Sequence, residues 1–505
     1  MIVEPAPDEF VARYDSGAAQ VVWTRLVADL ETPVSAFLKI AANRPMAFLF
    51  ESVEGGAVRG RYSIIGLEPD LIFRVRGAQA ELNRTASQHP DAFAPCTETP
   101  LAALRALIAE SRIDLPDTLP PPAAGLFGYL GYDMVRQMER LPNVNPDALG
   151  TPDAVLIRPG IVLVFDSVTD QIAIVTPVRP ERGVSAKAAL ARAVERLTAI
   201  VDRLDDPLPK SMREEHAGSI DIHALSSTSP ADYAAMVARA KEYIAAGDIF
   251  QVVLSQRFTT PFELSAFSLY RALRRVNPAP FLYFLDFGGL AIAGSSPEIL
   301  VRVRDRRVTI RPIAGTRPRG ATPHEDNALE RELLADPKER AEHLMLLDLG
   351  RNDVGRVAQI GSVAVTDRFF IERYSQVMHI VSNVEGVLAD GRDALDALIA
   401  GFPAGTVSGA PKVRAMQIID ELETEKRGIY AGCVGYFSAA GDMDTCIVLR
   451  TAVIKDGVMS VQAGAGIVAD SDPAAEQQEC INKAKALFRA AEEARRFASG
   501  AGRGQ

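Results

Sequence analysis

The chain has 505 residues, of which 48% are hydrophobic and 24% charged, and this indicates a continuous globular fold longer than one ordinary domain. A formal net charge of −10 provides no basic stripe, so nucleic-acid binding is not expected. The acidic, proline-containing start MIVEPAPDEF resembles neither a signal peptide nor a transit sequence, and the most apolar stretch, 281–294, is too short to span a bilayer. We therefore expect a soluble, cytoplasmic protein.

The four cysteines, at positions 96, 433, 446 and 480, include no closely spaced pair of the kind that binds a metal. Since thiols of proteins that are not exported stay reduced, we expect neither disulfides nor zinc. Cys433 stands in the sequence AGCVG, whose glycines are offset from the Gly-x-Cys-x-Gly spacing of glutamine amidotransferases. A buried thiol in a strand is the better interpretation.

The first two hundred residues predict short strands, separated by Gly/Pro turns, at 47–52, 62–65, 160–166 and 171–176. A helix is expected over 186–204. The segment 205–229 combines prolines, mixed charges and a Ser/Thr cluster, which is typical of a linker. We therefore divide the chain into an N-terminal part, 1–228, and a second part, 229–498, followed by a disordered tail, 499–505.

The second part begins with a helix that Ser229 caps, with Pro230 in its first turn, and Gly247 ends this helix. Strands are predicted at 249–258, 282–287, 308–312, 377–385, 433–438, 446–454 and 458–463, separated by helices and glycine-rich turns. This alternation predicts an α+β fold.

Two predicted helices present acidic faces. The sequence Asp336-Pro337-Lys338-Glu339 has the form of a capping box, so a helix is expected to about residue 349, with Glu339 and Glu342 one turn apart. A second helix starts at Asp472-Pro473. It places Glu476, Glu479 and Lys483 on one face, because steps of three, four and seven residues nearly complete whole turns.

Carboxylates suit Mg²⁺, which keeps several waters and accepts one or two protein carboxylates plus substrate oxygens. An alternative remains open from spacing alone: Glu339 completes its own cap, and the other acidic side chains pair with Lys483 on a wet surface.

Six segments together resemble the chorismate-utilising enzymes. They are RPIAGT at 311–316, KERAEH at 338–343, DLGRND at 348–353, VMH at 377–379, FPAGTVSGAPK at 402–412 and QAGAG at 462–466. The likeness covers essentially all of 230–490. It implies an α+β fold of the anthranilate-synthase type, in which two β-sheets pack orthogonally and helices cover the outside, with chorismate as the substrate.

The same resemblance implies a Mg²⁺ cofactor bound directly by Glu342 and Glu479, with Glu339 and Glu476 as outer partners. It implies that chorismate is held by Gly315, Thr316, Tyr430, Arg450, Gly464, Ala465, Gly466 and Lys483. A turn of small residues lets backbone N–H groups approach a carboxylate, and Arg450 can grip one bidentately.

The catalytic residues implied by the resemblance are Glu298, His379 and Thr316. Glu298, in Ser-Ser-Pro-Glu, corresponds to the general acid that helps the C4 hydroxyl of chorismate to leave, a role that requires a raised pKa. His379 either orients the substrate or assists proton transfer. Without the family, Glu298 would read as a surface residue after a turn and His379 as a structural histidine in a strand.

Two positions separate the members of the family by their nucleophile. Relatives that add water place a lysine base where this chain has Gln251, and relatives that make aminodeoxychorismate typically carry a lysine where this chain has Ala314. Glutamine cannot deprotonate water, and alanine leaves C2 open to ammonia. Within the family, the chain therefore resembles the large, component I subunits of anthranilate synthases, lyases that convert chorismate and ammonia to anthranilate and pyruvate in the first step of tryptophan biosynthesis.

The chain contains no glutaminase nucleophile, so the resemblance implies a partner amidotransferase subunit, component II, commonly in a heterotetramer. Ser52 and the segment Pro280, Phe281 and Leu282 resemble the two walls of a site for L-tryptophan as feedback inhibitor. Phe50, Phe281 and Leu282 depart from the residues usual at their positions but keep the apolar character. An ordinary turn and strand edge is the alternative there.

Two rival functions stay open. An aminodeoxychorismate synthase component I would aminate chorismate at C4 without releasing pyruvate, and a non-catalytic subunit would only sense tryptophan. The nature of the product separates the first from an anthranilate synthase, and absence of chorismate turnover identifies the second.

Overall fold

The computed structural model describes the chain except for residues 42–43, 55–57, 143–144, 209–223, 375–376 and 499–505. The predicted tail and most of the predicted linker lie outside the described residues. Among the residues described, no helix combines the length and apolar character that crossing a membrane requires.

Up to residue 205, the described structure contains four helices and eight strands, beside two short 3-10 turns. Its elements are α1 (Pro7–Asp15), β1 (Gln20–Val27), α2 (Pro33–Ile40), β2 (Ala47–Glu54), β3 (Val58–Arg76), β4 (Gln79–Asn83), β5 (Ala94–Pro95), α3 (Pro100–Glu110), β6 (Gly125–Leu130), β7 (Ala154–Asp166), β8 (Gln171–Val178) and α4 (Ala186–Asp205).

A short strand, β9 (Leu225–Ser226), precedes the predicted boundary at 228/229, and the second part ends with the longest helix of the described chain. The elements of the second part up to β16 are α5 (Pro230–Ala245), β10 (Gln251–Pro261), α6 (Ala266–Val276), β11 (Phe281–Asp286), β12 (Leu290–Ser296), β13 (Ile299–Arg304), β14 (Arg307–Ile310), β15 (Ile313–Pro318), α7 (Pro323–Ala335), α8 (Pro337–Gly355) and β16 (Ala364–Arg373). They are followed by β17 (Val377–Val387), α9 (Ala394–Gly401), α10 (Gly405–Ser408), β18 (Gly409–Ala410), α11 (Lys412–Leu422), β19 (Cys433–Ser438), β20 (Met443–Ile447), β21 (Thr451–Lys455), β22 (Val458–Ile467) and α12 (Pro473–Ala498).

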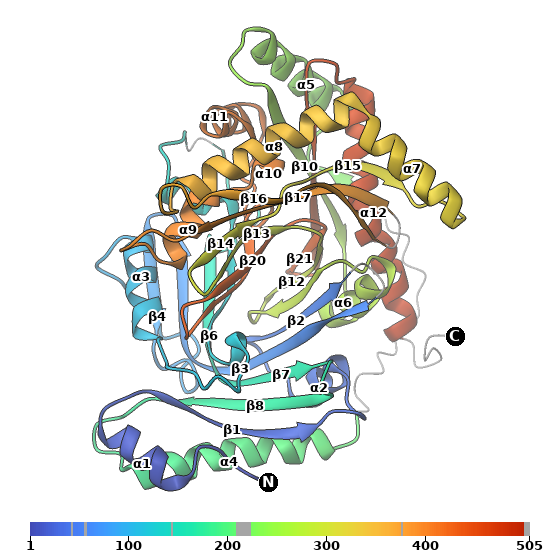
Figure 1. The fold of residues 1–505 in the computed structure, drawn as a ribbon. Helices are drawn as coiled ribbons and strands as arrows, with labels where there is room; N and C mark the ends of the chain where they lie inside the picture. The colour runs from blue at the N-terminus through green and yellow to red at the C-terminus, as the bar shows by residue number, and fades with distance from the viewer. Residues whose placement is uncertain (42–43, 55–57, 143–144, 209–223, 375–376, 499–505) are drawn as a thin grey trace.

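All strand pairs in the described chain are antiparallel, and strands from both parts pair with each other. One arm of the pairing runs β3–β2–β11–β12–β21–β22–β10. A second arm runs β3–β7–β6–β19–β20–β13–β14–β17. The strands lie in the middle of the molecule, and helices such as α8, α12 and α4 lie outside them (Figure 1). The predicted α+β fold is confirmed.

The two arms share an apolar core. One cluster of buried side chains draws Phe48, Tyr283 and Ile292 from the first arm and Phe127 and Val434 from the second. The rings of Phe48 and Phe127 stack with their centroids 4.7 Å apart. Since Phe48 and Phe127 belong to the first part of the chain and Tyr283, Ile292 and Val434 to the second, residues from both parts are needed to complete this core.

The two acidic helices begin where the sequence predicts. The Asp336 carboxylate accepts hydrogen bonds from the backbone N–H groups of Lys338 (2.9 Å) and Glu339 (3.3 Å), and Pro337 occupies the first turn of α8. Helix α8 continues to Gly355, six residues beyond the predicted end. Helix α12 begins at Pro473.

One predicted strand is wrong. The segment 446–454 is not continuous but is divided between β20 and β21, with a break at 448–450. Arg450 in this break has a φ of +47°, a conformation that costs free energy for a residue with a side chain. The sequence hides the break, because apolar residues run almost continuously through both pieces, as they do in a buried strand.

Candidate active site

A cavity of about 430 Å³ opens among the strands and helices of the second part. Its walls come from β10, β15, β17, β22, α8, α10 and α12, together with the turns that hold Glu298, Tyr430 and Arg450. The residues singled out from the sequence that line it are Gln251, Glu298, Ala314, Gly315, Thr316, Glu339, Glu342, His379, Tyr430, Arg450, Gly464, Gly466, Glu476, Glu479 and Lys483. Side chains from distant parts of the sequence thus meet in one place.

Ala465 is the exception among the predicted substrate residues. It does not line the cavity, and its methyl group lies fully buried in a core cluster to which α5, α6 and α12 contribute. Strand β22 explains this difference, because successive side chains of a strand point to opposite faces. Gly464 and Gly466 face the cavity, and Ala465 between them faces the core.

A side chain at either position would crowd a residue of the cavity. A Cβ on Gly466 would lie 2.4 Å from the Gln251 side-chain nitrogen, and a Cβ on Gly464 would lie 2.9 Å from the Tyr430 hydroxyl. The absence of side chains leaves the backbone of β22 accessible from the cavity. Lys483 of α12 fixes this backbone by donating a hydrogen bond to the Gly464 carbonyl over 2.8 Å.

Glu298 lies in the turn between β12 and β13 and is 7% exposed. Burial raises the pKa of its carboxyl to about 8, and the nearby Thr406 hydroxyl, the Ile313 backbone amide and the charge of Arg450 offset only part of that effect. The carboxyl is therefore mostly protonated at neutral pH. A buried, neutral carboxylic acid that faces a cavity is suited to donate a proton.

Arg450 brings a positive charge into the same cavity. It forms no salt bridge with any residue that the structure describes, and burial lowers the pKa of its guanidinium, although the charges of Tyr374 and Glu298 act in the opposite direction. Its left-handed backbone conformation interrupts the extended chain between β20 and β21, and its side chain lines the cavity. A desolvated guanidinium of this kind is suited to bind an anionic group of a ligand.

His379 of β17 is held as the neutral Nδ1–H tautomer. Its Nδ1 lies 3.0 Å from the Gly315 carbonyl oxygen and 3.1 Å from the Thr316 hydroxyl. Since a carbonyl oxygen only accepts hydrogen bonds, Nδ1 carries the proton and Nε2 keeps its lone pair. Burial lowers the pKa of His379 to about 4, so the ring stays uncharged near neutral pH.

Four carboxylates gather at the other end of the cavity, two from α8 and two from α12. The pKa of Glu342 is raised, first by burial and then by the charges of Glu339 and Glu479. The pKa of Glu476 is raised by burial, with a further contribution from Glu479. Glu339 is bound by Arg317 (2.9 Å) and Glu479 by Lys483 (2.7 Å). Negative charge remains in excess here.

This donor set fits a hard divalent cation better than a transition metal, because every acidic donor is a carboxylate oxygen. Among the described residues, no three or more His, Cys, Asp or Glu side chains converge closely enough to hold an ion by themselves. A Mg²⁺ ion at Glu342 and Glu479 would therefore need oxygens from water and substrate, which is its usual preference.

A second cavity, of about 300 Å³, lies between the two arms. Ser52, Phe281 and Leu282 line it, as do Phe50 and Tyr62, and its other walls come from β13, β19 and β20. Pro280 is not among its lining residues. Three of the four predicted tryptophan-site residues thus meet in one cavity, whose walls combine aromatic and charged side chains.

The sequence interpretation did not single out several residues of both cavities. Thr406 and Gln462 line the first, and Arg302, Arg304 and Asp444 line the second. Thr406 and Gln462 fall within quoted motifs, so the motifs held a signal for them. The other three lie on β13 and β20 outside every motif, and only the pairing of those strands places them at the second cavity.

Comparison with known proteins shows which family the chain resembles. Residues 48–489 match the model of a family described as chorismate binding enzyme. The chain is 58% identical over 497 residues to "Anthranilate synthase component 1" of Cereibacter sphaeroides, covering 98% of this chain and 99% of that protein. It is 48% identical to the protein of the same name from Thermus thermophilus, covering 92% of this chain and 96% of that protein.

Solved structures agree. Anthranilate synthase component I from Streptococcus pneumoniae superposes with a TM-score of 0.75 at 37% identity, covering 92% of this chain and 99% of that one. The menaquinone-specific isochorismate synthase MenF from Escherichia coli has a TM-score of 0.69 at 21% identity, covering 96% and 99%, and shares the fold.

The chain belongs to the family of chorismate-binding enzymes. Within that family, its motif-based resemblance to component I of the anthranilate synthases is confirmed by relatives that carry this name over nearly the full chain.

Proposed function

We propose that this chain is the large subunit of an anthranilate synthase, which converts chorismate and ammonia to anthranilate and pyruvate. The observation that carries the proposal is the meeting, in one cavity, of a buried acid, a desolvated guanidinium and a carboxylate cluster at the positions that the motifs single out. The names of relatives up to 58% identical point the same way.

In this proposal, Arg450 binds a carboxylate of chorismate. The substrate lies close to the backbone of Gly464 and Gly466, where no side chain blocks its approach. Glu298 protonates the C4 hydroxyl as it leaves, since its pKa of about 8 keeps the proton available at neutral pH. After ammonia has added at C2, the free Nε2 of His379 accepts the C2 proton while the C3–O bond breaks, and the departing enolpyruvyl group takes up a proton to become pyruvate. Thr316 and Gly315 hold the imidazole ring of His379 in place through Nδ1.

A Mg²⁺ ion at Glu342 and Glu479, when bound, would screen the charge of the substrate carboxylate against the acidic helices. Glu339 and Glu476 would orient these ligands or the water around the ion. Burial, and after it the charges of Glu339 and Glu479, raise the pKa of Glu342, and this crowding of carboxylates supports the assignment.

The choice of nucleophile rests on Ala314 and Gln251, both of which line the cavity. Neither side chain is an amine or a base, so the cavity supplies no nucleophile of its own at these places and leaves room for ammonia at C2. Ammonia would come from glutamine through a partner amidotransferase subunit, component II, in keeping with the component 1 naming of the relatives.

The experiment that tests this function incubates the purified chain with chorismate, Mg²⁺ and an ammonium salt at mildly alkaline pH. Anthranilate is followed by fluorescence and pyruvate by a coupled assay. Equal release of both, abolished by a chelator, is expected. Consumption of chorismate without pyruvate would identify an aminodeoxychorismate synthase instead, and no consumption would leave a binding subunit.

We further propose that the second cavity binds L-tryptophan as a feedback inhibitor. Phe50 and Phe281 offer faces for an indole ring, and the Ser52 hydroxyl offers a polar contact. A route to the active site exists in the strands, because Phe281 pairs with Ser296, two residues before Glu298. Tryptophan binding to the purified chain, measured by calorimetry together with loss of chorismate turnover, tests this assignment.

A further inference from the structure

An ion pair with almost no solvent contact lies beneath the active-site cavity. The Arg427 and Glu423 side chains are 1% and 4% exposed. The Arg427 guanidinium donates to both carboxylate oxygens of Glu423, from Nε over 2.9 Å and from a terminal nitrogen over 2.6 Å. Neither residue lines the cavity, so neither contacts a substrate bound there.

The remaining donors of Arg427 reach two walls of the cavity. One terminal nitrogen donates to the Val253 carbonyl of β10 (2.7 Å) and the other to the Val407 carbonyl of α10 (2.6 Å). Val253 and Val407 both line the cavity. The guanidinium also lies 5.6 Å from the ring centre of Tyr430, a third cavity residue.

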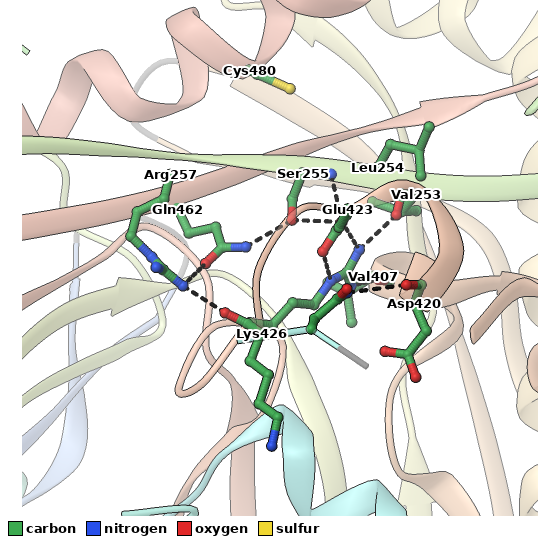
Figure 2. A network of polar contacts seen from close by, with 12 residues as sticks. Val253, Leu254, Ser255, Arg257, Val407, Asp420, Glu423, Lys426, Gln462 and Cys480 are labelled. Carbon is green, nitrogen blue, oxygen red and sulfur yellow. Dashed lines mark hydrogen bonds and ion pairs between the residues drawn. The ribbon is translucent and has the colours of Figure 1, made fainter. Parts of the chain in front are cut away.

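Glu423 extends the same network to a further wall. Its carboxylate accepts hydrogen bonds from the backbone N–H and the hydroxyl of Ser255, both over 2.8 Å. The Ser255 hydroxyl in turn accepts a hydrogen bond from the side chain of Gln462 on β22 over 2.9 Å, and Gln462 lines the cavity. Figure 2 shows Glu423 between Ser255 and the backbone of Val407, with Gln462 and Arg257 beside Ser255.

The two carbonyl acceptors of Arg427, on Val253 and Val407, are close in sequence to residues that contact the proposed catalytic groups. Thr406, next to Val407, lies beside the Glu298 carboxyl and lowers its pKa in part. Gln251, two residues before Val253, donates to the Glu342 carboxylate over 3.5 Å. One ion pair therefore fixes segments that reach the general acid at one end of the cavity and the carboxylate cluster at the other.

We propose that the Arg427–Glu423 pair is a positioning device for the reaction, which aligns β10, α10 and β22 around the substrate without touching it. Stability alone is a weak reason for such a pair, because a buried ion pair can often be replaced by apolar residues without loss of stability. If apolar side chains replaced the pair, however, the carbonyl groups of Val253 and Val407 would lose the hydrogen bonds that orient them. The proposal rests on the proposed function only for its activity readout.

The test compares Arg427→Met, Arg427→Lys and the double variant R427M/E423L with the wild-type chain. We expect kcat for chorismate to fall about 10²-fold in R427M, the loss that a misplacement near 1 Å can cause, with a smaller change in KM. Lysine keeps the charge but not the two-pronged geometry, so R427K should recover only part of kcat. The double variant should regain thermal stability and still have a low kcat.

Arg158→Met is the matched control. Arg158 is also buried and forms a two-pronged pair, with Asp70 (2.7 and 2.9 Å), but it lines neither cavity. It should lose stability and keep kcat. Wild-type kcat and an unshifted pH profile in R427M/E423L would overturn the proposal, as would equal losses of kcat in R158M and R427M.

Amide hydrogen exchange tests the anchoring without substrate, and so separates a failure of this proposal from a failure of the proposed function. Exchange should rise in peptides that cover 251–258 and 403–410 in R427M and in the double variant, and stay unchanged there in R158M. Unchanged exchange in these peptides would overturn the proposal even if the wild-type chain proved to make a product other than anthranilate.

Discussion

The two cavities of this chain differ in how their charges are satisfied. In the first, Arg450 has no salt bridge within the described structure, and the carboxylates of α8 and α12 crowd together. In the second, charged side chains already pair, as Arg302 does with Asp444 over 3.0 Å, and aromatic rings supply much of the wall. The first cavity therefore gains most from a charged ligand and a cation, whereas the second is suited to a flat, largely apolar ligand.

The largest expected effect comes from removing the buried acid. Glu298→Gln keeps the shape of the side chain but cannot donate an acidic proton, so we expect kcat to fall about 10²- to 10⁴-fold with little change in KM. Steady-state kinetics with anthranilate as readout measures this. Glu263→Gln, on an exposed glutamate, is the control, and an E298Q enzyme that kept kcat close to that of the wild type would contradict the role of a general acid.

The pH dependence follows from the same carboxyl. Because the acid must be protonated to act and the pKa is that of the ligand-free chain, kcat/KM should fall as the pH rises through about 8, and this decline should be missing from the residual activity of E298Q. The folded-state pKa lies above the ordinary value of 4.5, so the wild-type free energy of unfolding should also decrease between about pH 4.5 and 8. Thermal melts of both proteins across this range test this expectation: the stability of E298Q relative to the wild type should increase as the pH rises.

A smaller loss is expected at the carboxylate cluster. Glu342→Gln removes one negative charge from the proposed Mg²⁺ site, so activity at low Mg²⁺ should fall about 10- to 100-fold and recover in part at high Mg²⁺. Asp348→Asn, on the same helix but paired with Arg351 at the surface, should leave the Mg²⁺ dependence unchanged. Identical Mg²⁺ titrations for wild type and E342Q would remove Glu342 from the site.

The second cavity should respond in inhibition. Phe281→Ala takes away an aromatic wall, and the tryptophan concentration for half inhibition should rise about tenfold, since one ring contact and its buried area are worth about 1.4 kcal/mol. Phe250→Ala, on a ring that is 71% exposed and outside the cavity, is the control. An unchanged inhibition curve in F281A would place the regulatory site elsewhere.

The smallest effect tests how the cavities communicate. Tyr283 lines the second cavity, and its hydroxyl lies 2.6 Å from the hydroxyl of Thr451, the neighbour of Arg450. Tyr283→Phe removes this hydrogen bond at a cost of about 1 kcal/mol, so inhibition by tryptophan should weaken about fivefold at most. Tryptophan affinity from calorimetry should change less than the inhibition does. Equal changes in both would indicate a local effect on binding.

Elements with strong local signals were predictable. Helices α8 and α12 start at an aspartate followed by proline, and strand β19 has the predicted bounds. The break at 448–450 was not predictable, because apolar residues run almost continuously on both sides of it, as in one long buried strand. Only the packing of β20 and β21 against different partners, β13 and β12, requires the chain to turn there.

The candidate site shows the same division. The motifs named its residue types, and the carboxylate face of each acidic helix follows from the helical repeat. Ala465 faces the core because of the register of its strand. Arg427 donates to two carbonyl groups that lie far from it in sequence. No local pattern encodes these contacts.

The sequence by itself determined the family, the helix starts and the chemical groups available for the reaction, because motifs, caps and residue types are local. Tertiary structure alone decided the raised pKa of Glu298, the absence of a salt-bridge partner for Arg450 among the described residues and the meeting of β2 with β11 at the second cavity. The physical reason is that burial, and with it the free energy of a charge, is set by whatever packs around a group once the chain has folded.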